Sequence, residues 1–313
     1  MLGKTAGGLF WMYRYLERAE NTARLIEAGQ RIALTRLEAG DAEWTSILQS
    51  AGVKGAFDRE NDTVTRDAAV DWMLRSRANP SSVLSCIESA RHNARLVRTA
   101  LTGEVWAATN AAYMRIRENL ARKVSERDLP DVLREIRQHT SLVRGMTHGT
   151  MLRNEIYDFV RLGTFLERAD NTARILDVKY YVLLPSVSAV GTSLDNVQWE
   201  TILRAVSARG GFRMEYGAGG GPAEITEFLV LNKRMPRSLA FCVDKLRSNL
   251  HYLHKGIDGQ LPSLAMVDHL ERQYLSHDIA AVFECGLHQF IEEILGQLSR
   301  IARQVEIDFR FYE

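Results

Sequence analysis

A nine-residue motif that occurs twice constrains the fold of this 313-residue chain more than any other feature. Residues 16–24 read Leu-Glu-Arg-Ala-Glu-Asn-Thr-Ala-Arg, and residues 166–174 differ only at Asp170, which replaces Glu20. A repeat of apolar residues alone would indicate only that two helices pack in a similar way. Because the glutamate, arginine and asparagine residues also recur, the repeat indicates that these polar side chains have a defined task.

Each motif copy, read as a helix, has an apolar face and a polar face. The apolar face has the spacing of a coiled-coil seam and comprises Leu9, Met12, Leu16, Ala19, Ala23 and Ile26, repeated as Phe159, Leu162, Leu166, Ala169, Ala173 and Leu176. The polar stripe points away from this seam and comprises Glu17, Asn21 and Arg24, repeated as Glu167, Asn171 and Arg174. We therefore expect two long helices that pack in equivalent ways.

The polar stripe has two interpretations that the sequence leaves open. Glu20 and Asp170 each precede an arginine by four residues, but an exposed helical ion pair contributes only about 0.3–0.5 kcal/mol. In a large bundle the stripe can be buried, as a network in which the charged groups satisfy one another. Alternatively, it lines a charged groove for a partner or substrate, which Arg153 and Glu155, just before the second copy, would extend.

The motif residues are expected to divide between structure and binding. Arg18 and Arg168 lie at the edge of the seam, so we expect them to be mostly structural. Glu17, Asn21 and Arg24, with their counterparts in the second copy, are expected to contact something outside the bundle. Paired arginines suit the recognition of carboxylate or phosphate groups. A glutamate beside them can hold an amine, but nearby arginines lower a carboxyl pKa and disfavour its use as a base.

The composition favours an all-α fold and argues against several classes of function. Apolar residues make up 46% and charged residues 25%, as in ordinary globular proteins, and there are only six prolines. The formal net charge of +1 gives no electrostatic reason to expect a nucleic-acid or anionic-membrane surface. No apolar run approaches the roughly 20 residues that span a bilayer, and three cysteines do not suggest a disulfide framework. We therefore predict a large helical bundle in the cytoplasm.

The match between the two parts of the chain extends beyond the motif. The corresponding residues include Trp44 and Trp199, Pro80 and Pro236, and Cys86 and Cys242. The sequence therefore predicts two helical repeats, residues 1–150 and 151–313, which form the halves of one bundle related by a pseudo-twofold axis. Both of these cysteines fall in apolar helical stretches and are expected to be buried thiols.

Local patterns predict where several helices begin and end. The first helix is expected over residues 5–37, and Pro80 suits the first turn of a helix that starts at Ser81. Residues 145–150 contain two glycines and predict a kinked connection before the second motif helix. Residues 210–221 are rich in glycine, whose backbone entropy is costly to restrict, so we expect the most mobile internal loop there.

Sequence signatures of catalysis are scarce. The chain lacks a Gly-x-Ser-x-Gly elbow, a His-Glu-x-x-His pair, a Cys-x-x-Cys motif and a phosphate-binding P-loop. His251 and His254 have a helical spacing that permits metal binding, but no carboxylate accompanies them at the spacing of a di-iron bundle. We therefore expect no metal site and no cofactor, and the sequence assigns no catalytic residue.

The beginning of the chain, with Met1-Leu2, Trp11-Met12 and residues 14–24, resembles the alpha-E family of all-helical bacterial proteins. The resemblance covers the whole chain, and the doubled Glu-Arg motif makes it specific. Genes for alpha-E proteins tend to lie beside, or to be fused to, genes for ATP-grasp-like ligases and transglutaminase-like peptidases, which implies a peptide-modifying system. The second copy departs from the first in having Thr164 where the first has Arg14, which places Arg14 outside the duplicated core.

Three alternatives for the function follow from the resemblance and the residues. The first is a non-catalytic helical partner that docks an ATP-grasp-like ligase or presents its peptide substrate, with a transglutaminase-like peptidase as a further partner. The second is an enzyme, or an enzyme subunit, that acts on a peptide or amino-acid substrate at the Glu-Arg face. The third makes the motif purely structural and places the function elsewhere.

Overall fold

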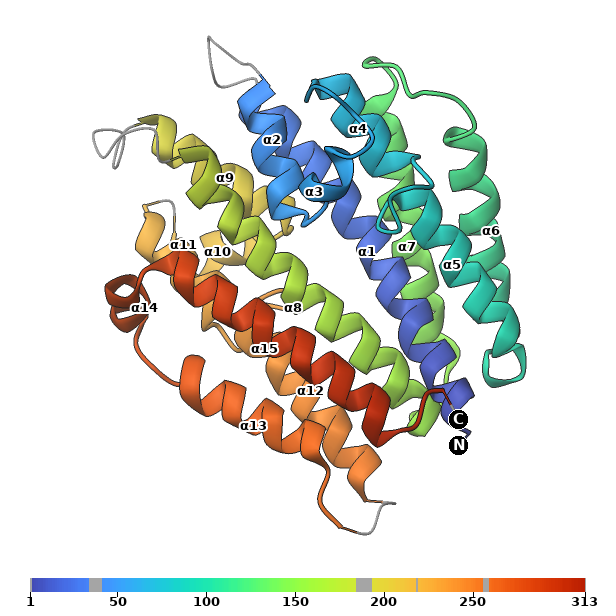
Figure 1. Ribbon diagram of the computed structural model, residues 1–313. Helices are drawn as coiled ribbons and strands as arrows, with labels where there is room; N and C mark the ends of the chain where they lie inside the picture. The colour runs from blue at the N-terminus through green and yellow to red at the C-terminus, as the bar shows by residue number, and fades with distance from the viewer. Residues whose placement is uncertain (1, 34–40, 184–192, 218, 256–258, 313) are drawn as a thin grey trace.

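The two motif copies lie on two long helices, α1 (Gly3–Ala33) and α8 (Glu155–Leu183), which pack against each other through the middle of the molecule (Figure 1). The structure is a computed structural model, and it describes residues 2–33, 41–183, 193–217, 219–255 and 259–312. Within these residues the chain forms fifteen α-helices, one short 3-10 helix and no strand. The predicted all-α fold is therefore confirmed.

The other helices follow in two series, one after each motif helix. After α1 come α2 (Asp41–Ser50), α3 (Lys54–Phe57), α4 (Arg66–Leu74), α5 (Val83–Leu96), the 3-10 helix η1 (Arg98–Ala100), α6 (Gly103–Asn119) and α7 (Leu129–Thr150). After α8 come α9 (Ser193–Ala205), α10 (Arg209–Tyr216), α11 (Pro222–Val230), α12 (Leu239–His254), α13 (Pro262–Tyr274), α14 (Ile279–Cys285) and α15 (Leu287–Asp308).

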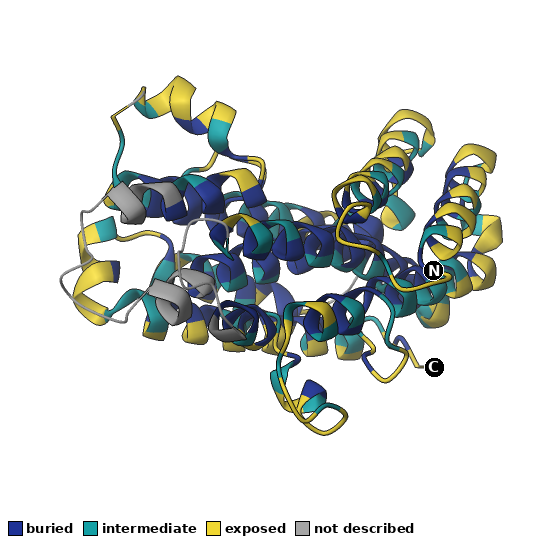
Figure 2. Cartoon of the chain, turned by 90° about the horizontal axis from the view of Figure 1, so that it is seen from above, coloured by how far each residue is buried: buried dark blue, intermediate teal, exposed yellow. Residues whose placement is uncertain are grey.

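The two motif helices are surrounded by similar sets of neighbours. Helix α1 packs against α5 and α7, and α8 packs against α12 and α15. The short helices cross over, because α2 lies against α8 and α9 lies against α1. Buried residues concentrate along the central helices, whereas the outer helices expose one side (Figure 2). The predicted division into repeats at residue 150 stays a prediction, and contacts such as these join residues from both sides of it.

The predicted seams form the contact between the central helices and their neighbours. All twelve seam positions are buried, with exposed fractions of 2% or less. Burying a large apolar side chain of this kind contributes about 1.5–3 kcal/mol relative to leaving it in water. The small seam residues Ala19, Ala23, Ala169 and Ala173 are fully buried, and they let neighbouring helices approach closely.

The start of α5 differs from its prediction. The helix begins at Val83, because the Ser82 side chain accepts a hydrogen bond from the backbone nitrogen of Ser85 and so caps the helix N-terminus. Pro80 lies before this cap, so its prediction as a first-turn proline was wrong. Helix α12 begins in the same way, with Ser238 accepting from the backbone nitrogen of Phe241.

The kinked connection predicted for residues 145–150 was also wrong, because α7 continues through this segment to Thr150. Its glycines tolerate the helix, and Val143 and Thr147 are buried on the side of α7 that includes Thr140. The hydroxyl groups of Thr147 and Thr150 donate to backbone carbonyls four residues earlier, at 2.8 and 2.7 Å. Packing against α1 therefore outweighs the low helix propensity of glycine.

Only part of the glycine-rich stretch 210–221 is a loop. Residues 209–216 form α10, because Phe212 is buried and stacks on Tyr216 and against Phe228. A loop remains at Gly217, whose φ of +72° favours glycine, and at residues 219–221 before α11. Residue 218 lies outside the described residues, and the mobility of the whole stretch stays a prediction. The predicted end of the first helix, near residue 37, also lies outside the described residues.

The described helices include none that is both long enough and apolar enough to cross a membrane.

The three cysteines should differ sharply in reactivity. Cys86 and Cys242 are buried, as predicted, and burial raises the pKa of each thiol to about 12, whereas Cys285 is exposed. We expect a colorimetric disulfide reagent to react quickly with one thiol per native chain at neutral pH, and with the other two only after unfolding. Rapid reaction of two or three thiols in the native protein would contradict this packing.

Candidate functional site

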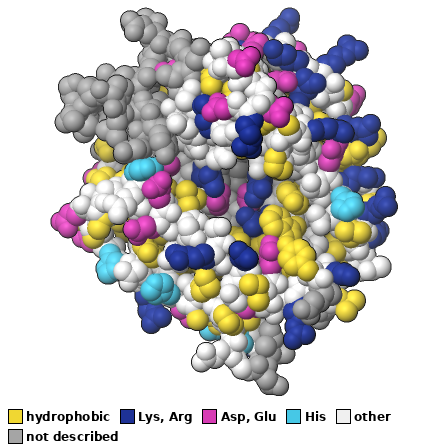
Figure 3. Space-filling view, viewed as in Figure 1, with side chains coloured by type: hydrophobic (Ala, Val, Ile, Leu, Met, Phe, Trp, Pro, Cys, Tyr) yellow, Lys and Arg dark blue, Asp and Glu magenta, His cyan; other side chains and the backbone are white. Residues whose placement is uncertain are grey.

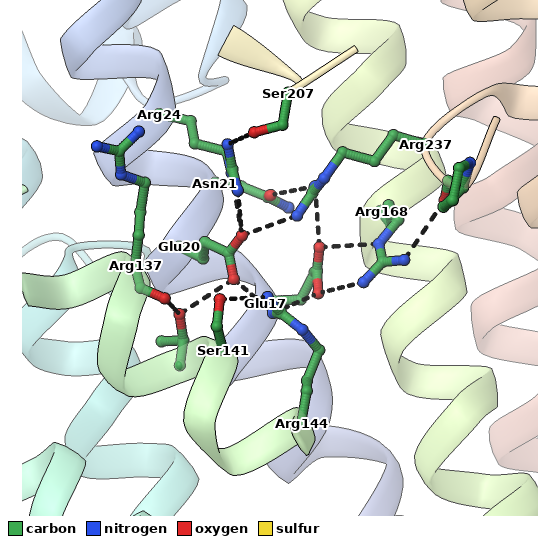
Figure 4. A network of polar contacts seen from close by, with 12 residues as sticks. Glu17, Glu20, Asn21, Arg24, Arg137, Ser141, Arg144, Arg168, Ser207 and Arg237 are labelled. Carbon is green, nitrogen blue, oxygen red and sulfur yellow. Dashed lines mark hydrogen bonds and ion pairs between the residues drawn. The ribbon is translucent and has the colours of Figure 1, made fainter. Parts of the chain in front are cut away.

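The first motif copy lies inside a buried network of ion pairs (Figure 4). Two carboxylates from α1 are surrounded by four arginines, which come from α1, α7, α8 and the turn before α12. None of these charged side chains is more than 16% exposed. We call this set the closed network, and it consists of Glu17, Glu20, Asn21, Arg24, Arg144, Arg168 and Arg237.

Glu17 is surrounded by three guanidinium groups. Arg168 donates from Nε to Oε1 at 3.0 Å and from Nη2 to Oε2 at 3.1 Å. Arg144 donates from Nη1 to Oε2 at 3.1 Å, and Nη1 of Arg237 lies 3.0 Å from Oε1. The residue is only 1% exposed, so these arginines replace the water that would otherwise solvate its charge.

Glu20 has no exposed surface and has four partners. Arg24, one turn further along α1, donates to Oε1 from Nε at 3.0 Å and from Nη2 at 2.7 Å, which confirms the predicted helical pair. The same oxygen accepts from Nη2 of Arg237 at 2.8 Å. The other oxygen accepts from the Thr140 hydroxyl at 3.0 Å and forms an ion pair with Arg144.

Burial and ion pairing act in opposite directions on these groups. Burial raises the pKa of Glu17, but the three surrounding arginines lower it by more, so this pKa lies well below its ordinary value. Burial and the charge of Glu17 raise the pKa of Glu20, yet the arginines also hold it below its ordinary range. For Arg237 burial prevails, and its pKa falls to about 10 in spite of Glu17. Both carboxyl groups are therefore ionised at neutral pH.

The second motif copy forms a smaller set of ion pairs. Glu167 accepts from Nε of Arg18 at 2.5 Å, and from Nη2 of Arg18 and Nε of Arg14, each at 2.9 Å. Burial raises the pKa of Glu167, but Arg18 and Arg14 lower it to about 2. Asp170 accepts from Nε and Nη2 of Arg174 at 2.7 and 3.3 Å. We call this set the open site, and it consists of Arg14, Arg18, Glu167, Asp170, Asn171 and Arg174.

The two motif copies bind each other reciprocally. Arg18 of the first copy holds Glu167 of the second with two hydrogen bonds, and Arg168 holds Glu17 in the same way. Each glutamate is thus paired with the arginine of the other copy rather than with the arginine beside it. Two helices in a pseudo-twofold relation would pair in this manner, but the superposition of residues 1–150 on 151–313 stays a prediction.

The open site lines a cavity of about 310 Å³. Its polar wall comes from α1, α8 and the turn before α5, where Ser81 lies, and its apolar wall includes Leu295 and Leu298 of α15. Gly52, in the turn after α2, contributes to the rim. In the space-filling view, basic and acidic side chains lie together around a hollow near the middle of the face that includes α1, α8 and α15 (Figure 3). The closed network is thus buried, whereas the open site borders a cavity.

A family model with the description "a predicted alpha-helical domain with a conserved ER motif" matches residues 1–309. The chain belongs to the Alpha-E family. The Glu-Arg dipeptide stands in both copies of the repeated motif, and in this Alpha-E protein the glutamate of each copy binds the arginine of the other.

Similar curated proteins include uncharacterised proteins of Mycobacterium bovis and Mycobacterium tuberculosis. Each is 24% identical over 95% of the Alpha-E chain. The chain spans only 35% of the length of these relatives. No solved structure matches the chain.

The structure places the predicted site residues in three different environments. Glu17 and Arg24 were expected to contact something outside the bundle, but they are at most 8% exposed and bind other parts of the chain. Asn21 was expected to do the same; it is 5% exposed, accepts from Arg237 and also borders the cavity. Arg18 and Arg168 hold the two glutamates, in agreement with a structural role. The second-copy residues Glu167, Asn171 and Arg174 border the cavity.

Arg153 and Glu155 do not extend the charged groove. Glu155 is the first residue of α8 and Arg153 lies just before it, and twelve residues of helix, about 18 Å, separate Glu155 from Glu167. The Arg153 guanidinium instead lies 4.3 Å from the centre of the Tyr252 ring. The prediction that these two residues extend the charged groove was therefore wrong, because the length of α8 between them and the motif keeps them apart.

Several residues that complete the site were not found from the sequence. Arg144 and Arg237 come from elements more than 100 residues away from Glu17, and no motif marks them. Arg14 was set aside because the second copy has Thr164 at its position, yet Arg14 binds Glu167 across the helix pair. The sequence did contain one signal for Arg237. The residues before the two corresponding serines, Ser82 and Ser238, differ between the halves: they are Ser81 and Arg237.

His251 and His254 lie in the last turn of α12. His254 contacts the backbone carbonyl of Gly259 at 2.6 Å, and no group of three or more metal-ligating side chains occurs among the described residues.

Proposed function

We propose that this Alpha-E protein is a non-catalytic binding partner in a peptide-modifying system, and that it presents a peptide to an ATP-grasp-like ligase. The observation that carries the proposal is the cavity lined by residues of both motif copies, because a charged cavity of this size is suited to hold part of a ligand. The ligase and a transglutaminase-like peptidase as partners come from the family resemblance. The mycobacterial relatives are about three times longer than this chain, so in those proteins further domains can accompany the matching region.

The chemistry of the cavity favours binding over catalysis. A general base works best with a pKa near neutrality, but Arg18 and Arg14 hold the pKa of Glu167 at about 2 against the effect of burial. The nearby thiol of Cys86 is a poor nucleophile, because burial raises its pKa to about 12. Guanidinium and carboxylate groups that are already ordered by one another are, in contrast, well suited to recognise a charged ligand.

The proposal predicts that a cavity variant loses function in the complex without losing its fold. Asp170→Asn should lower peptide turnover by an ATP-grasp-like ligase that is co-expressed with this protein by at least about tenfold, since hydrogen bonds to charged groups are worth about 1.5–3 kcal/mol. Asp58→Asn is the control, because Asp58 also pairs with a basic residue four positions away, Lys54, but does not line the cavity. The measurements are co-purification with the ligase and product formation with and without the Alpha-E protein.

Three outcomes separate the alternatives for the function. Ligase capture with no turnover by the isolated Alpha-E protein supports the binding partner. Turnover of a peptide or amino acid by the isolated protein would make it an enzyme instead. Equal product formation with wild-type protein, Asp170→Asn and no Alpha-E protein would leave the motif a purely structural role and overturn the proposal.

A further inference from the structure

The cavity occupies the position that an arginine fills in the other half of the molecule. In the closed network, the Thr172 hydroxyl of the second motif copy donates to the backbone carbonyl of Arg237 at 2.7 Å. In the open site, the Thr22 hydroxyl of the first copy donates to the backbone carbonyl of Ser81 at 3.5 Å. Positions 81 and 237 therefore have the same relation to the motif helices.

The neighbouring residues support this correspondence. Ser82 and Ser238 follow the two positions, and each caps the helix that begins next. The thiols of Cys86 and Cys242 each lie 3.8 Å from the carbonyl of a proline one residue before the same positions. Position 81 thus carries a serine where position 237 carries an arginine, and the serine side chain is too short to fill the space.

The guanidinium of Arg237 shows which groups recognise a cation at this position. It contacts Glu17 Oε1 at 3.0 Å, Glu20 Oε1 at 2.8 Å and Asn21 Oδ1 at 3.2 Å. The corresponding side chains of the second copy line the cavity, and they are Glu167, Asp170 and Asn171.

Two of these three side chains have hydrogen-bonding capacity left over. Asn171 is 6% exposed, and its Nδ2 has no hydrogen-bond partner in the described structure. A half-turn of this amide exchanges Nδ2 and Oδ1, so the same group can accept from a ligand. Asp170 accepts from Arg174, whereas its counterpart Glu20 accepts from Arg24, Arg237 and Thr140 and pairs with Arg144 as well.

The charge of the cavity is compatible with a cation. The open site has three arginines and two carboxylates. Apart from Arg237, the closed network has the same balance, with Arg24, Arg144 and Arg168 around Glu17 and Glu20. Since the closed network holds an additional guanidinium in this setting, the open site is able to do so too.

The size and walls of the cavity suit one long basic side chain. Its volume of about 310 Å³ is at the lower end of the range for ligand pockets. Leu295 and Leu298 of α15 form an apolar wall that can pack against the methylene groups of an arginine side chain.

We propose that the open site binds a guanidinium group, carried by an arginine side chain of a peptide ligand, with Glu167, Asp170 and Asn171 in the places that Glu17, Glu20 and Asn21 occupy around Arg237. This inference rests on the proposed function for the peptide, and it names the chemical group that the site recognises.

The first test is direct binding to the purified full chain, without any ligase. The probes for titration calorimetry are N-acetyl-arginine amide, its neutral isostere N-acetyl-citrulline amide, and N-acetyl-glutamate as an anion. We expect binding of the arginine probe, and binding of the citrulline probe at least about tenfold weaker, because charge-assisted hydrogen bonds are roughly twice as strong as neutral ones. Asp170→Asn should weaken arginine binding by at least about tenfold, and Asp58→Asn should leave it unchanged.

The second test supplies the missing guanidinium from the chain itself. Ser81→Arg should fill the cavity as Arg237 fills its own site, which should abolish binding of the arginine probe and raise the thermal midpoint. Ser276→Arg is the control, because Ser276 is exposed in the turn between α13 and α14 and the substitution adds the same charge. If the Ser81→Arg protein does not fold, the comparison of arginine binding in wild type and Asp170→Asn still tests the inference.

Several results would overturn the inference. They are equal binding of the arginine and citrulline probes, binding of the glutamate probe alone, or unchanged arginine binding in Asp170→Asn. Failure of the proposed function is a separate result: arginine binding that persists in a protein that neither captures the ligase nor affects its product would remove the ligase role and keep the guanidinium site.

Discussion

Replacing Glu17 with alanine is expected to destabilise the protein by about 3–5 kcal/mol, the cost of leaving buried charges without their partner. Glu17 is the common partner of Arg144, Arg168 and Arg237, and its removal leaves Glu20 as the one carboxylate among the four arginines of the closed network. The measurement is the free energy of unfolding in urea at neutral pH, for wild type and Glu17→Ala.

Two other glutamate variants calibrate this expectation. Glu167→Ala should cost less than Glu17→Ala, because Arg14 and Arg18 border the cavity, where water can take the place of the carboxylate. Glu135→Ala should cost less than about 1 kcal/mol, since its ion pair with Arg115 is largely exposed. Equal losses in Glu17→Ala and Glu135→Ala would mean that the closed network is not the buried structure described above.

The same network makes stability sensitive to acid. The pKa of Glu17 is below its ordinary value in the folded protein, because the arginines outweigh burial, and it returns to the ordinary value on unfolding. The unfolded chain therefore binds protons first as the pH falls. The stabilisation is complete above about pH 5 and is lost as the pH falls below the ordinary carboxyl pKa toward the folded one. The acid-induced loss of stability should be smaller in Glu17→Ala than in wild type.

The sequence predicted the helical architecture well because the pattern that specifies it is local. The seam positions on both motif helices follow three- and four-residue steps, and all of them are buried as expected. The predictions failed where tertiary packing overrides local propensity. Residues 145–150 stay helical because α7 packs against α1, and residues 209–216 are helical because Phe212 is buried.

The division of the motif into a closed network and an open site could not be predicted from the repeat itself. The two copies differ only at Glu20 and Asp170, and this difference alone does not distinguish buried charges from a binding surface. What distinguishes them is the set of side chains that other elements bring in. Arg144 reaches the first copy from α7, and position 81 brings a serine to the second copy where position 237 brings an arginine to the first. A long arginine can fill such a position and a serine cannot, so side chains from other elements, and not the repeat itself, distinguish the closed network from the open site.

The close contact between the two motif helices provides the last test. A methyl group added at Gly163 of α8 would lie 2.2 Å from the carbonyl oxygen of Phe10 in α1, closer than atoms can approach. Because the obstacle is backbone, it cannot rotate away, and Gly163→Ala should destabilise the protein by about 3 kcal/mol, the upper part of the range for overpacked cores. The measurement is again urea unfolding at neutral pH.

Gly145→Ala is the matched control for this substitution. Gly145 is an exposed glycine within helix α7, and an added methyl group meets nothing within 4 Å, so alanine should stabilise the helix there by up to about 1 kcal/mol. If Gly163→Ala destabilises the protein and Gly145→Ala stabilises it, the close approach of α1 and α8 at Gly163 leaves no room for a methyl group. Gly163 lies one turn before Glu167, so separating the helices there should also pull Arg14 and Arg18 away from Glu167 and weaken binding of the arginine probe. A stable Gly163→Ala protein with unchanged binding would contradict both the close approach of the helices and its role in forming the open site.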